Sequence, residues 1–147
     1  MKEEDRKGGE YPVFGSNGIV GYHNEYLAEG PLIIVGRKGT AGAVTYSEKN
    51  GFPIDTTFYV KLKNKNSVDL KYLYYTMTNL DLGKVNTQSG VPGLNRNDAY
   101  KVKIPLPPIE IQKQLVAEAE KEEEIITANR RLVELMEGKI SKVLENI

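Results

Sequence analysis

The C-terminal part of this chain carries a seven-residue repeat, and that repeat constrains the fold more than any other feature. Two series offset by four run through residues 109–147: Leu115, Glu122, Asn129, Met136 and Val143, and Ala119, Ile126, Val133, Ile140 and Ile147. Such series occupy the a and d positions of a coiled coil. A helix of this length extends roughly 58 Å at 1.5 Å per residue. The rest of the chain is too small to cover it, so the repeat predicts that the helix pairs with another helix.

The start of the helix and the composition of its seam refine this prediction. Pro108 suits the first helical turn, where its missing N–H would have no partner in any case. Glu110 lies near the positive end of the helix dipole. The seam is imperfect, because Glu122 and Asn129 are polar and Gly138 costs about 1 kcal/mol in a helix interior.

An exposed apolar seam of this length favours a homodimer. Monomers rarely leave contiguous apolar patches larger than a few hundred Å² in water. We expect an antiparallel pair, in which Asn129 near the middle of the helix helps to fix the register. The alternatives are a helix that folds back onto its own domain and one that waits for a full-length partner. The predicted pairing surface consists of Leu115, Ile126, Asn129, Val133, Met136, Ile140, Val143 and Ile147, and it is widened by Ile125, Leu132 and Leu144.

The preceding residues form short apolar runs separated by glycine-rich turns, which is typical of a small α+β domain. Asp69 caps a predicted helix that carries apolar side chains at helical spacing up to Leu80. Residues 82–97 are expected to be a loop. The expected strands are two around a turn within residues 11–22, then residues 31–35, 43–47, 56–63 and 102–106.

These patterns divide the chain into three parts. We predict a polar tail over residues 1–10, a domain with a small mixed or antiparallel sheet over residues 11–107, and a long coiled-coil helix over residues 108–147. The fold class is therefore α+β.

Residue types that carry chemistry are scarce. The chain has no cysteine, which excludes disulfides and thiolate metal sites, and its single histidine is His23. No carboxylates cluster at metal-ligand spacing. The stretch GRKGT at residues 36–40 lacks the spacing of a phosphate-binding loop, and there is no GxSxG. We therefore expect no catalytic residue, no metal and no cofactor, including S-adenosylmethionine and ATP.

The sequence also gives expectations about the compartment. No apolar run approaches the roughly 18 residues that a membrane span needs, and residues 1–10 lack the apolar region of a signal peptide. The absence of cysteine fits a reducing environment. We expect a cytoplasmic protein with no membrane partner.

The net charge of zero hides an asymmetry between the two parts. Residues 11–109 hold eleven Lys and Arg against seven Asp and Glu, whereas residues 110–147 hold six against nine. We therefore expect any polyanion to meet the domain rather than the helix. A solvated surface with a chance imbalance is the alternative.

Two glycine-containing loops carry side chains that can read base pairs. Arginine pairs with guanine, and asparagine or glutamine with adenine, through two hydrogen bonds in the major groove; lysine suits phosphates. Ordinary polar loop residues are the alternative interpretation. The residues predicted to contact double-stranded DNA are Asn17, Arg37, Lys38, Lys84, Asn86, Gln88, Asn95 and Arg96.

Several segments together resemble the specificity (S) subunit of Type I restriction-modification systems. In order along the chain they are YPVFGSNGIVGYHNEYL, IIVGRKGTAGAV, PIDTTFYV, SGVPGLNRND and IPLPPIEIQKQL. The most diagnostic is the LPPxExQ run at Leu106–Gln112. The resemblance covers nearly all of residues 11–147 and identifies one target recognition domain followed by one conserved spacer helix.

The resemblance implies a function. Such subunits usually carry two recognition domains and two helices, which pair antiparallel so that each domain reads half of a bipartite DNA site. They bind modification subunits, which use S-adenosylmethionine to methylate adenine, and restriction subunits join that complex. One domain here implies a half subunit, a truncated product or an excised piece. The stretch MKEEDRKGG stands where family domains usually carry an extra segment, often with Trp.

Two other functions compete with DNA recognition. One is a pure interaction protein, a remnant or decoy half subunit that pairs through its helix and binds no DNA. The other is a small nuclease, which Mg²⁺-dependent activity would reveal; the lack of carboxylate clusters argues against it.

Overall fold

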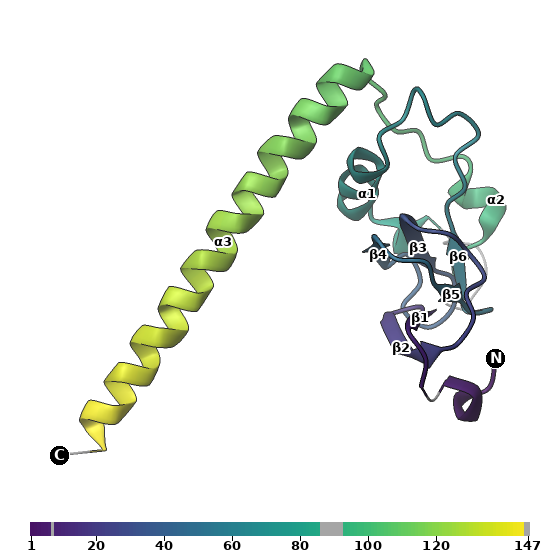
Figure 1. Cartoon of the computed structure of the whole chain (residues 1–147). Coiled ribbons are helices and arrows are strands. Elements are labelled where there is room, and N and C mark those ends of the chain that lie inside the picture. Colours follow the sequence, from purple (N-terminus) through teal and green to yellow (C-terminus); the bar gives the residue numbers. More distant parts are fainter. Residues whose placement is uncertain (7, 86–92, 146–147) are drawn as a thin grey trace.

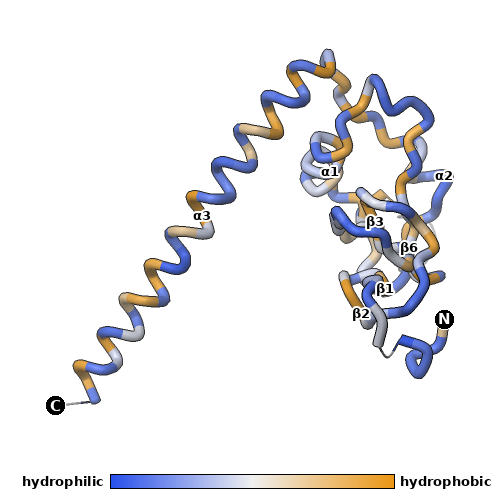
Figure 2. Tube along the Cα trace, viewed as in Figure 1, coloured by the Kyte–Doolittle hydropathy of each residue, from blue (hydrophilic) through white to orange (hydrophobic). Residues whose placement is uncertain are grey.

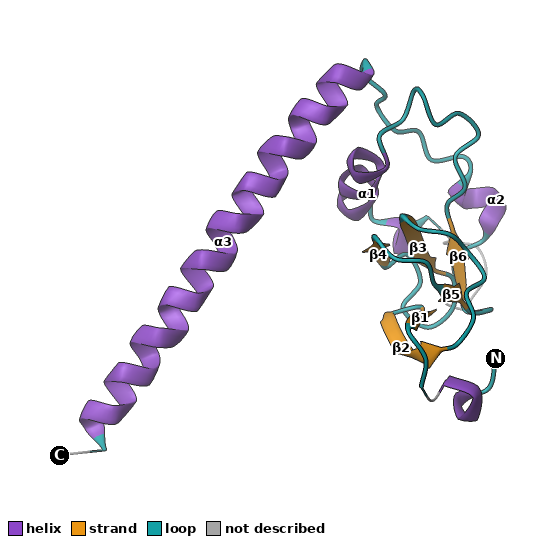
Figure 3. Ribbon diagram, in the orientation of Figure 1, coloured by secondary structure: helices purple, strands orange, loops and turns teal. Residues whose placement is uncertain are grey.

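The computed structural model describes residues 1–6, 8–85 and 93–145 as a small domain from which one long helix extends (Figure 1). Short strands and helices make up the domain (Figure 3). The strands are β1 (Tyr11–Gly15), β2 (Gly18–His23), β3 (Leu32–Gly36), β4 (Val44–Ser47), β5 (Phe52–Pro53) and β6 (Thr57–Tyr59). The helices are η1 (Glu3–Arg6), α1 (Leu70–Asn79), η2 (Leu82–Lys84), α2 (Arg96–Ala99) and α3 (Ile109–Leu144).

The strands form two three-stranded sheets rather than one. In the order β2-β1-β5, β1 pairs antiparallel with β2 and parallel with β5. In the order β4-β3-β6, both pairings of the central β3 are antiparallel. The predicted mixed or antiparallel α+β domain is confirmed.

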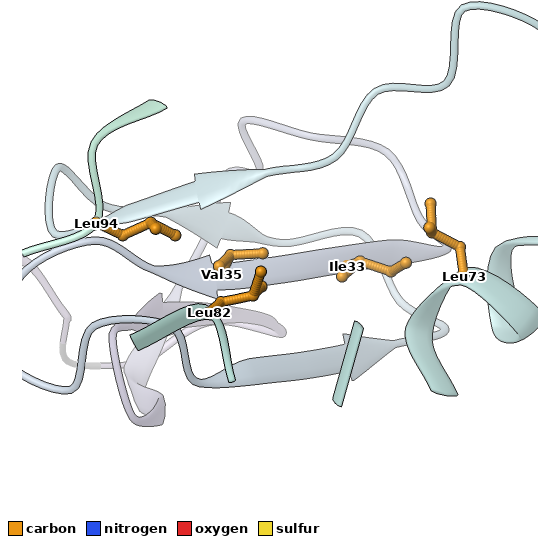
Figure 4. Packing of buried hydrophobic residues seen from close by; sticks show 5 residues of the cluster. All are labelled: Ile33, Val35, Leu73, Leu82 and Leu94. Carbon is orange, nitrogen blue, oxygen red and sulfur yellow. The ribbon is translucent and has the colours of Figure 1, made fainter. Parts of the chain in front are cut away.

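The central strand β3 is buried along its whole length and supplies both hydrophobic clusters. Successive strand side chains point to opposite faces. Ile33 and Val35 pack with leucines from α1, η2 and the segment before α2, which Figure 4 labels as Leu73, Leu82 and Leu94. Leu32 and Ile34 pack instead with Phe14 and Ala28. A strand covered on both faces reads as a continuous apolar run, which is why PLIIV was recognisable in the sequence.

Some sequence expectations about secondary structure need correction. The strand expected at residues 56–63 ends at Tyr59, and β5 was not expected. Residues 102–106 form no strand. Pro105 has no N–H for a sheet ladder, while Val102 and Ile104 pack against the core as an extended segment. Residues 82–97, expected as a loop, contain η2 and the first residues of α2.

The first residues of the expected tail fold against the domain. The 3-10 helix η1 lies beside β2, and Gly21 of β2 comes so close to Arg6 that a Cβ there would stand 2.7 Å from the Arg6 carbonyl oxygen. The Arg6 guanidinium donates a hydrogen bond to the Met1 carbonyl oxygen at 2.8 Å.

Both predicted helices form. Asp69 caps α1 as expected, because its carboxylate accepts a hydrogen bond from the Tyr72 amide at 2.9 Å. Helix α3 starts one residue later than predicted, since Pro108 occupies the N-cap position. Of the α3 side chains that the structure describes, those of Gln112 and Val116 are buried. The remainder of α3 extends away from the domain, with apolar and polar residues alternating along it (Figure 2).

Gly138 lies in the interior of α3, and a Cβ added there would meet no described atom within 4 Å beyond the backbone of the helix itself. Replacing Gly138 by Ala should therefore stabilise the helix by about 1 kcal/mol, raising the melting temperature followed by circular dichroism at 222 nm. The reverse change at an exposed position of the same helix, Ala128→Gly, should lower it by a similar amount. Equal melting temperatures for all three proteins would contradict a continuous helix at these positions.

Candidate nucleic-acid interface

The loop that follows β3 is held by its own backbone. The Gly36 amide donates to the Ala43 carbonyl oxygen at 2.8 Å, and the Gly42 amide donates to the Gly36 carbonyl oxygen at the same distance. Gly39 and Gly42 have positive φ angles of 72° and 85°, which other residues adopt only at a cost. The loop therefore has a defined shape and presents Arg37 and Lys38, both exposed, at its start.

Segments from other parts of the chain meet this loop through backbone contacts, including Thr56, whose carbonyl oxygen accepts a hydrogen bond from the Arg37 amide at 2.8 Å. The turn between β1 and β2 comes close at Gly36, where a Cβ would lie 2.7 Å from the Ser16 carbonyl oxygen. Helix η2 packs against Gly42, where a Cβ would overlap the Gly83 nitrogen. The Leu94 amide donates to the Arg37 carbonyl oxygen at 2.8 Å. Segments far apart in sequence thus converge on residues 36–43.

The convergence brings together most of the predicted DNA-contacting residues. Asn17 is exposed at the tip of the β1–β2 turn, and Arg96 is exposed as the first residue of α2. The backbone of Lys38 forms an isolated antiparallel β-bridge with Gly93. The predicted residues Asn86 and Gln88 lie outside the described residues.

Two further predicted residues, Asn95 and Lys84, have partners within the domain. The Asn95 side chain caps α2 by accepting a hydrogen bond from the Asn97 amide at 2.8 Å. Lys84 forms an ion pair with Asp81. The hydrogen bond that the Lys84 ammonium donates to the Asp81 carboxylate raises the pKa of Lys84. Because Lys84 is largely exposed, water and salt screen that pair, and a phosphate can compete with Asp81 for the ammonium group.

Aromatic residues beside the loops were missed by the sequence analysis. The Arg37 guanidinium carbon lies 5.4 Å from the centre of the Phe58 ring, a cation–π contact that holds the guanidinium over β6. Tyr100, after α2, is 78% exposed. Phe58, Arg96 and Tyr100 also line a cavity of about 610 Å³ whose other walls are mostly core side chains. The alternation of TTFYV indicated a strand but could not show which loop its aromatic residues face.

The loops and α3 are attached at opposite ends of the second sheet. Gly36 pairs with Thr57 at the end of β3 from which the loop leaves. At the other end the Val60 amide donates to the Ile33 carbonyl oxygen at 2.9 Å, and the chain continues through residues 61–69 to α1. Residues 67–69 contact the first turn of α3 through Gln112.

Helix α1 contacts the next turns of α3 through charged and aromatic side chains. Lys71 forms ion pairs with Glu120 and with Glu48, and the Tyr75 hydroxyl donates to the Glu123 carboxylate at 3.0 Å. Burial, with the hydrogen bond to Glu123 as the next cause, raises the pKa of Tyr75 to about 12. Burial beside Glu48 likewise raises the pKa of Tyr46 to about 12.

The apolar seam of α3 points elsewhere. The domain-facing row contains Gln112, Val116 and Glu120, and the row through Leu115 and Ile126 lies roughly 100° around the helix from it. The seam therefore remains open to solvent, and the alternative of a helix folded back onto its own domain is wrong. Exposed side chains along it include Leu115, Ile126, Val133, Met136, Ile140 and Val143, all between 44% and 63% exposed. Ile147 lies outside the described residues.

In residues 1–6, 8–85 and 93–145, no three His, Cys, Asp or Glu side chains are placed to hold a metal ion. Nor does the described part of the chain contain a helix long and apolar enough to cross a membrane.

Comparison with known proteins identifies the family. The profile described as Type I restriction modification DNA specificity domain matches residues 1–144. The chain belongs to this family. Specificity subunits are generally non-catalytic. The family match includes η1.

Relatives of the specificity domain include longer proteins. The specificity subunit of the Type I restriction enzyme EcoprrI of Escherichia coli is 28% identical over 107 residues, which cover 73% of this chain and 26% of that protein. A protein of Mycoplasma pneumoniae named as a putative type I specificity subunit is 28% identical over 112 residues, which cover 73% of this chain and 37% of that protein. The chain thus spans between about a quarter and somewhat over a third of these relatives.

Solved structures have the same fold. The S subunit of a Type I restriction-modification system from M. genitalium superposes with a TM-score of 0.68 at 20% identity, over 88% of this chain and 39% of that one. A chain from a structure that concerns complex assembly and conformational transition of the type I R-M system superposes with a TM-score of 0.70 at 16% identity. The superposition covers 92% of this chain and 36% of that one. The long C-terminal helix is therefore part of the specificity-subunit fold.

Two glycines of the 36–43 loop test whether the loops really pack together. Gly39→Ala should cost about 1–2 kcal/mol, the strain of its positive φ alone. A Cβ added at Gly39 would lie 3.4 Å from its nearest neighbour, the Ser16 hydroxyl oxygen, which is ordinary contact. Gly42→Ala shares that strain and also collides with the Gly83 nitrogen, so it should cost a further 1–3 kcal/mol or so. Urea unfolding measures both. Equal costs would mean that the 36–43 loop and η2 are not in contact.

Proposed function

We propose that this chain recognises a DNA sequence as a half specificity subunit, and that its dimer directs an adenine methyltransferase and restriction complex to a bipartite site. The observation that carries the proposal is the convergence of Asn17, Arg37, Lys38, Lys84 and Arg96 on one end of the domain. Family membership supports the nucleic-acid role. The proposal places the recognition domain at residues 11–107 and the spacer helix at residues 108–147, in a cytoplasmic complex.

The side chains around the 36–43 loop suit a division of roles. A guanidinium can donate two hydrogen bonds to a guanine, and Arg37 is held over Phe58 while Arg96 is held at the start of a short helix. Lys38 and Lys84 are better suited to phosphates, which fix position without reading sequence. Asn17 lies at the tip of the β1–β2 turn, which contacts the same loop at Gly36, and it is assigned to the DNA contact as well.

The exposed seam of α3 supports the second half of the proposal. Two copies that pair antiparallel through Leu115, Ile126, Val133, Ile140 and their neighbours would imitate the two-helix spacer of a full subunit. A two-fold axis would then relate the two domains, and identical domains would read a palindromic bipartite site. Asn129 lies near the middle of α3 and would meet a polar partner there. The same seam could serve a protein that pairs without binding DNA, an outcome that the DNA experiment below decides.

The recognition loops are tested by binding of the complex assembled with modification subunits to its target DNA. Arg37→Ala and Arg96→Ala should each weaken specific binding by about 1–3 kcal/mol and relax one position of the site, a change of roughly 5- to 150-fold in Kd. Lys84→Ala should weaken all sequences alike and lower the slope of log Kd against log salt by about one. Fluorescence anisotropy across a salt series measures each effect.

Lys65→Ala is the matched control. Lys65 is exposed in the loop between β6 and α1, at the other end of the sheet, and its removal should change neither specificity nor the salt slope. Intact specific binding by both arginine variants would overturn the loop assignment. A wild-type complex that forms but binds no DNA would favour the pure pairing function.

The pairing surface is tested by light scattering at tens of micromolar. The wild-type chain should be a dimer, and Ile126, Val133 and Ile140 all replaced by Asp should give a monomer, because three carboxylates would be buried without partners. The control carries Asp at Ala117, Thr127 and Ser141, which are exposed on α3 outside the seam, and it should remain a dimer. A wild-type monomer would refute the pairing, as would a seam variant that stays dimeric.

A further inference from the structure

The joint between the domain and α3 is built around one buried amide. Gln112 is 0% exposed, and among the described residues it and Thr57 are the buried polar ones. Its side-chain oxygen accepts a hydrogen bond from the Asp69 amide at 2.9 Å. Its side-chain nitrogen donates to the Ser67 carbonyl oxygen at 3.0 Å and to the Pro107 carbonyl oxygen at 2.7 Å.

These three bonds join the segments that meet at the joint. Ser67 and Asp69 belong to the loop before α1, and Pro107 belongs to the linker before α3. Asp69 also caps α1 with its own carboxylate, so the starts of α1 and α3 are tied to each other through a single residue. Both N–H donors and the carbonyl of the amide are used. A buried network satisfied in this way favours one geometry, because any rotation leaves a buried polar group without a partner.

The outer contacts between α1 and α3 are of a different kind. Lys71, Tyr75 and their glutamate partners lie at the partly exposed edge, where solvent screens an ion pair and long side chains can rearrange. They can follow a change in helix angle. The three hydrogen bonds of the buried Gln112 side chain cannot follow such a change.

We propose that Gln112 is a positioning residue that fixes the angle between the recognition domain and α3 and so sets the spacing of the two half-sites. The second part rests on the proposed function. The lever is long: Lys139 lies about 40 Å along the helix from Gln112 at 1.5 Å per residue, so a 10° change at the joint displaces it by roughly 7 Å. In an antiparallel pair the partner's domain sits at that far end. A displacement of roughly 7 Å equals about two base pairs at 3.4 Å each.

The angle can be measured because the chain has no cysteine. Nitroxide labels on two introduced cysteines, Asn79→Cys at the exposed end of α1 and Lys139→Cys on α3, report the distance between the helices by pulsed electron resonance. Diluting labelled with unlabelled full-length chain removes distances between protomers. The parent should give one narrow distribution. Gln112→Asn, whose amide is one methylene shorter, should broaden or shift it by several Å, whereas Gln114→Asn, an exposed amide on the same helix turn, should not.

A second variant decides the matter even if Gln112→Asn does not fold. Lys71→Met with Tyr75→Phe removes the outer contacts at the surface and leaves Gln112 intact, so the distribution should stay narrow. A broad distribution in that variant would overturn the proposal, because the outer contacts would then hold the angle. A folded Gln112→Asn protein with an unchanged distribution would overturn it equally.

The link to spacing is tested with a series of DNA sites whose half-sites are separated by different numbers of base pairs. In the complex with modification subunits, the parent should prefer one spacer length, and Gln112→Asn should bind neighbouring lengths nearly as well while keeping its preference for the half-site sequence. A sharp spacer preference in Gln112→Asn despite a broadened distance would refute this link. Failure of the parent to recognise any DNA would instead sink the proposed function, and the distance measurement would still decide the role of Gln112 at the joint.

Discussion

Burial of β3 on both faces is the constraint on which the rest of the domain depends. Its alternate side chains fill two separate clusters, one against α1 and η2 and one against Phe14 of the first sheet. With both faces covered, the ends of the strand are the places where the chain can reach solvent. The 36–43 loop leaves one end, and the partner strand β6 leads away from the other end toward the joint with α3. The fold thereby separates a surface rich in basic loops from the attachment of the long helix.

The packing of the loops and the joint between the domain and α3 depend on different interactions. At the loops, glycines allow backbones to approach within van der Waals distance, so that residues far apart in sequence present their side chains over one small area. At the joint, a fully bonded buried amide supplies the geometry. Hydrophobic burial is non-directional, whereas hydrogen bonds to Gln112 are directional. A protein that must place two recognition surfaces at a set separation gains from the directional kind.

The sequence predicted elements with strong local signals. The heptad repeat and Pro108 predicted α3 to within one residue at its start, and Asp69 predicted the cap of α1, because both depend on short-range periodicity and capping. It failed where tertiary partners decide. Residues 102–106 had strand-like side chains but no ladder partner, and the cation–π contact between Arg37 and Phe58 depends on the register of β6 against β3. Gln112 stood inside the most diagnostic segment, yet nothing local distinguishes a buried glutamine from its exposed neighbour Gln114.

The central claim is that identical recognition domains, held apart by paired helices, select the DNA site of a methyltransferase. Sequencing the methylated bases in the genome of cells that carry this chain with a cognate modification subunit tests it most directly. We predict methylated adenines in one palindromic motif whose half-sites are separated by a spacer of fixed length, and the loss of that motif without the chain. Methylation that is absent, or that is the same with and without the chain, would contradict the account.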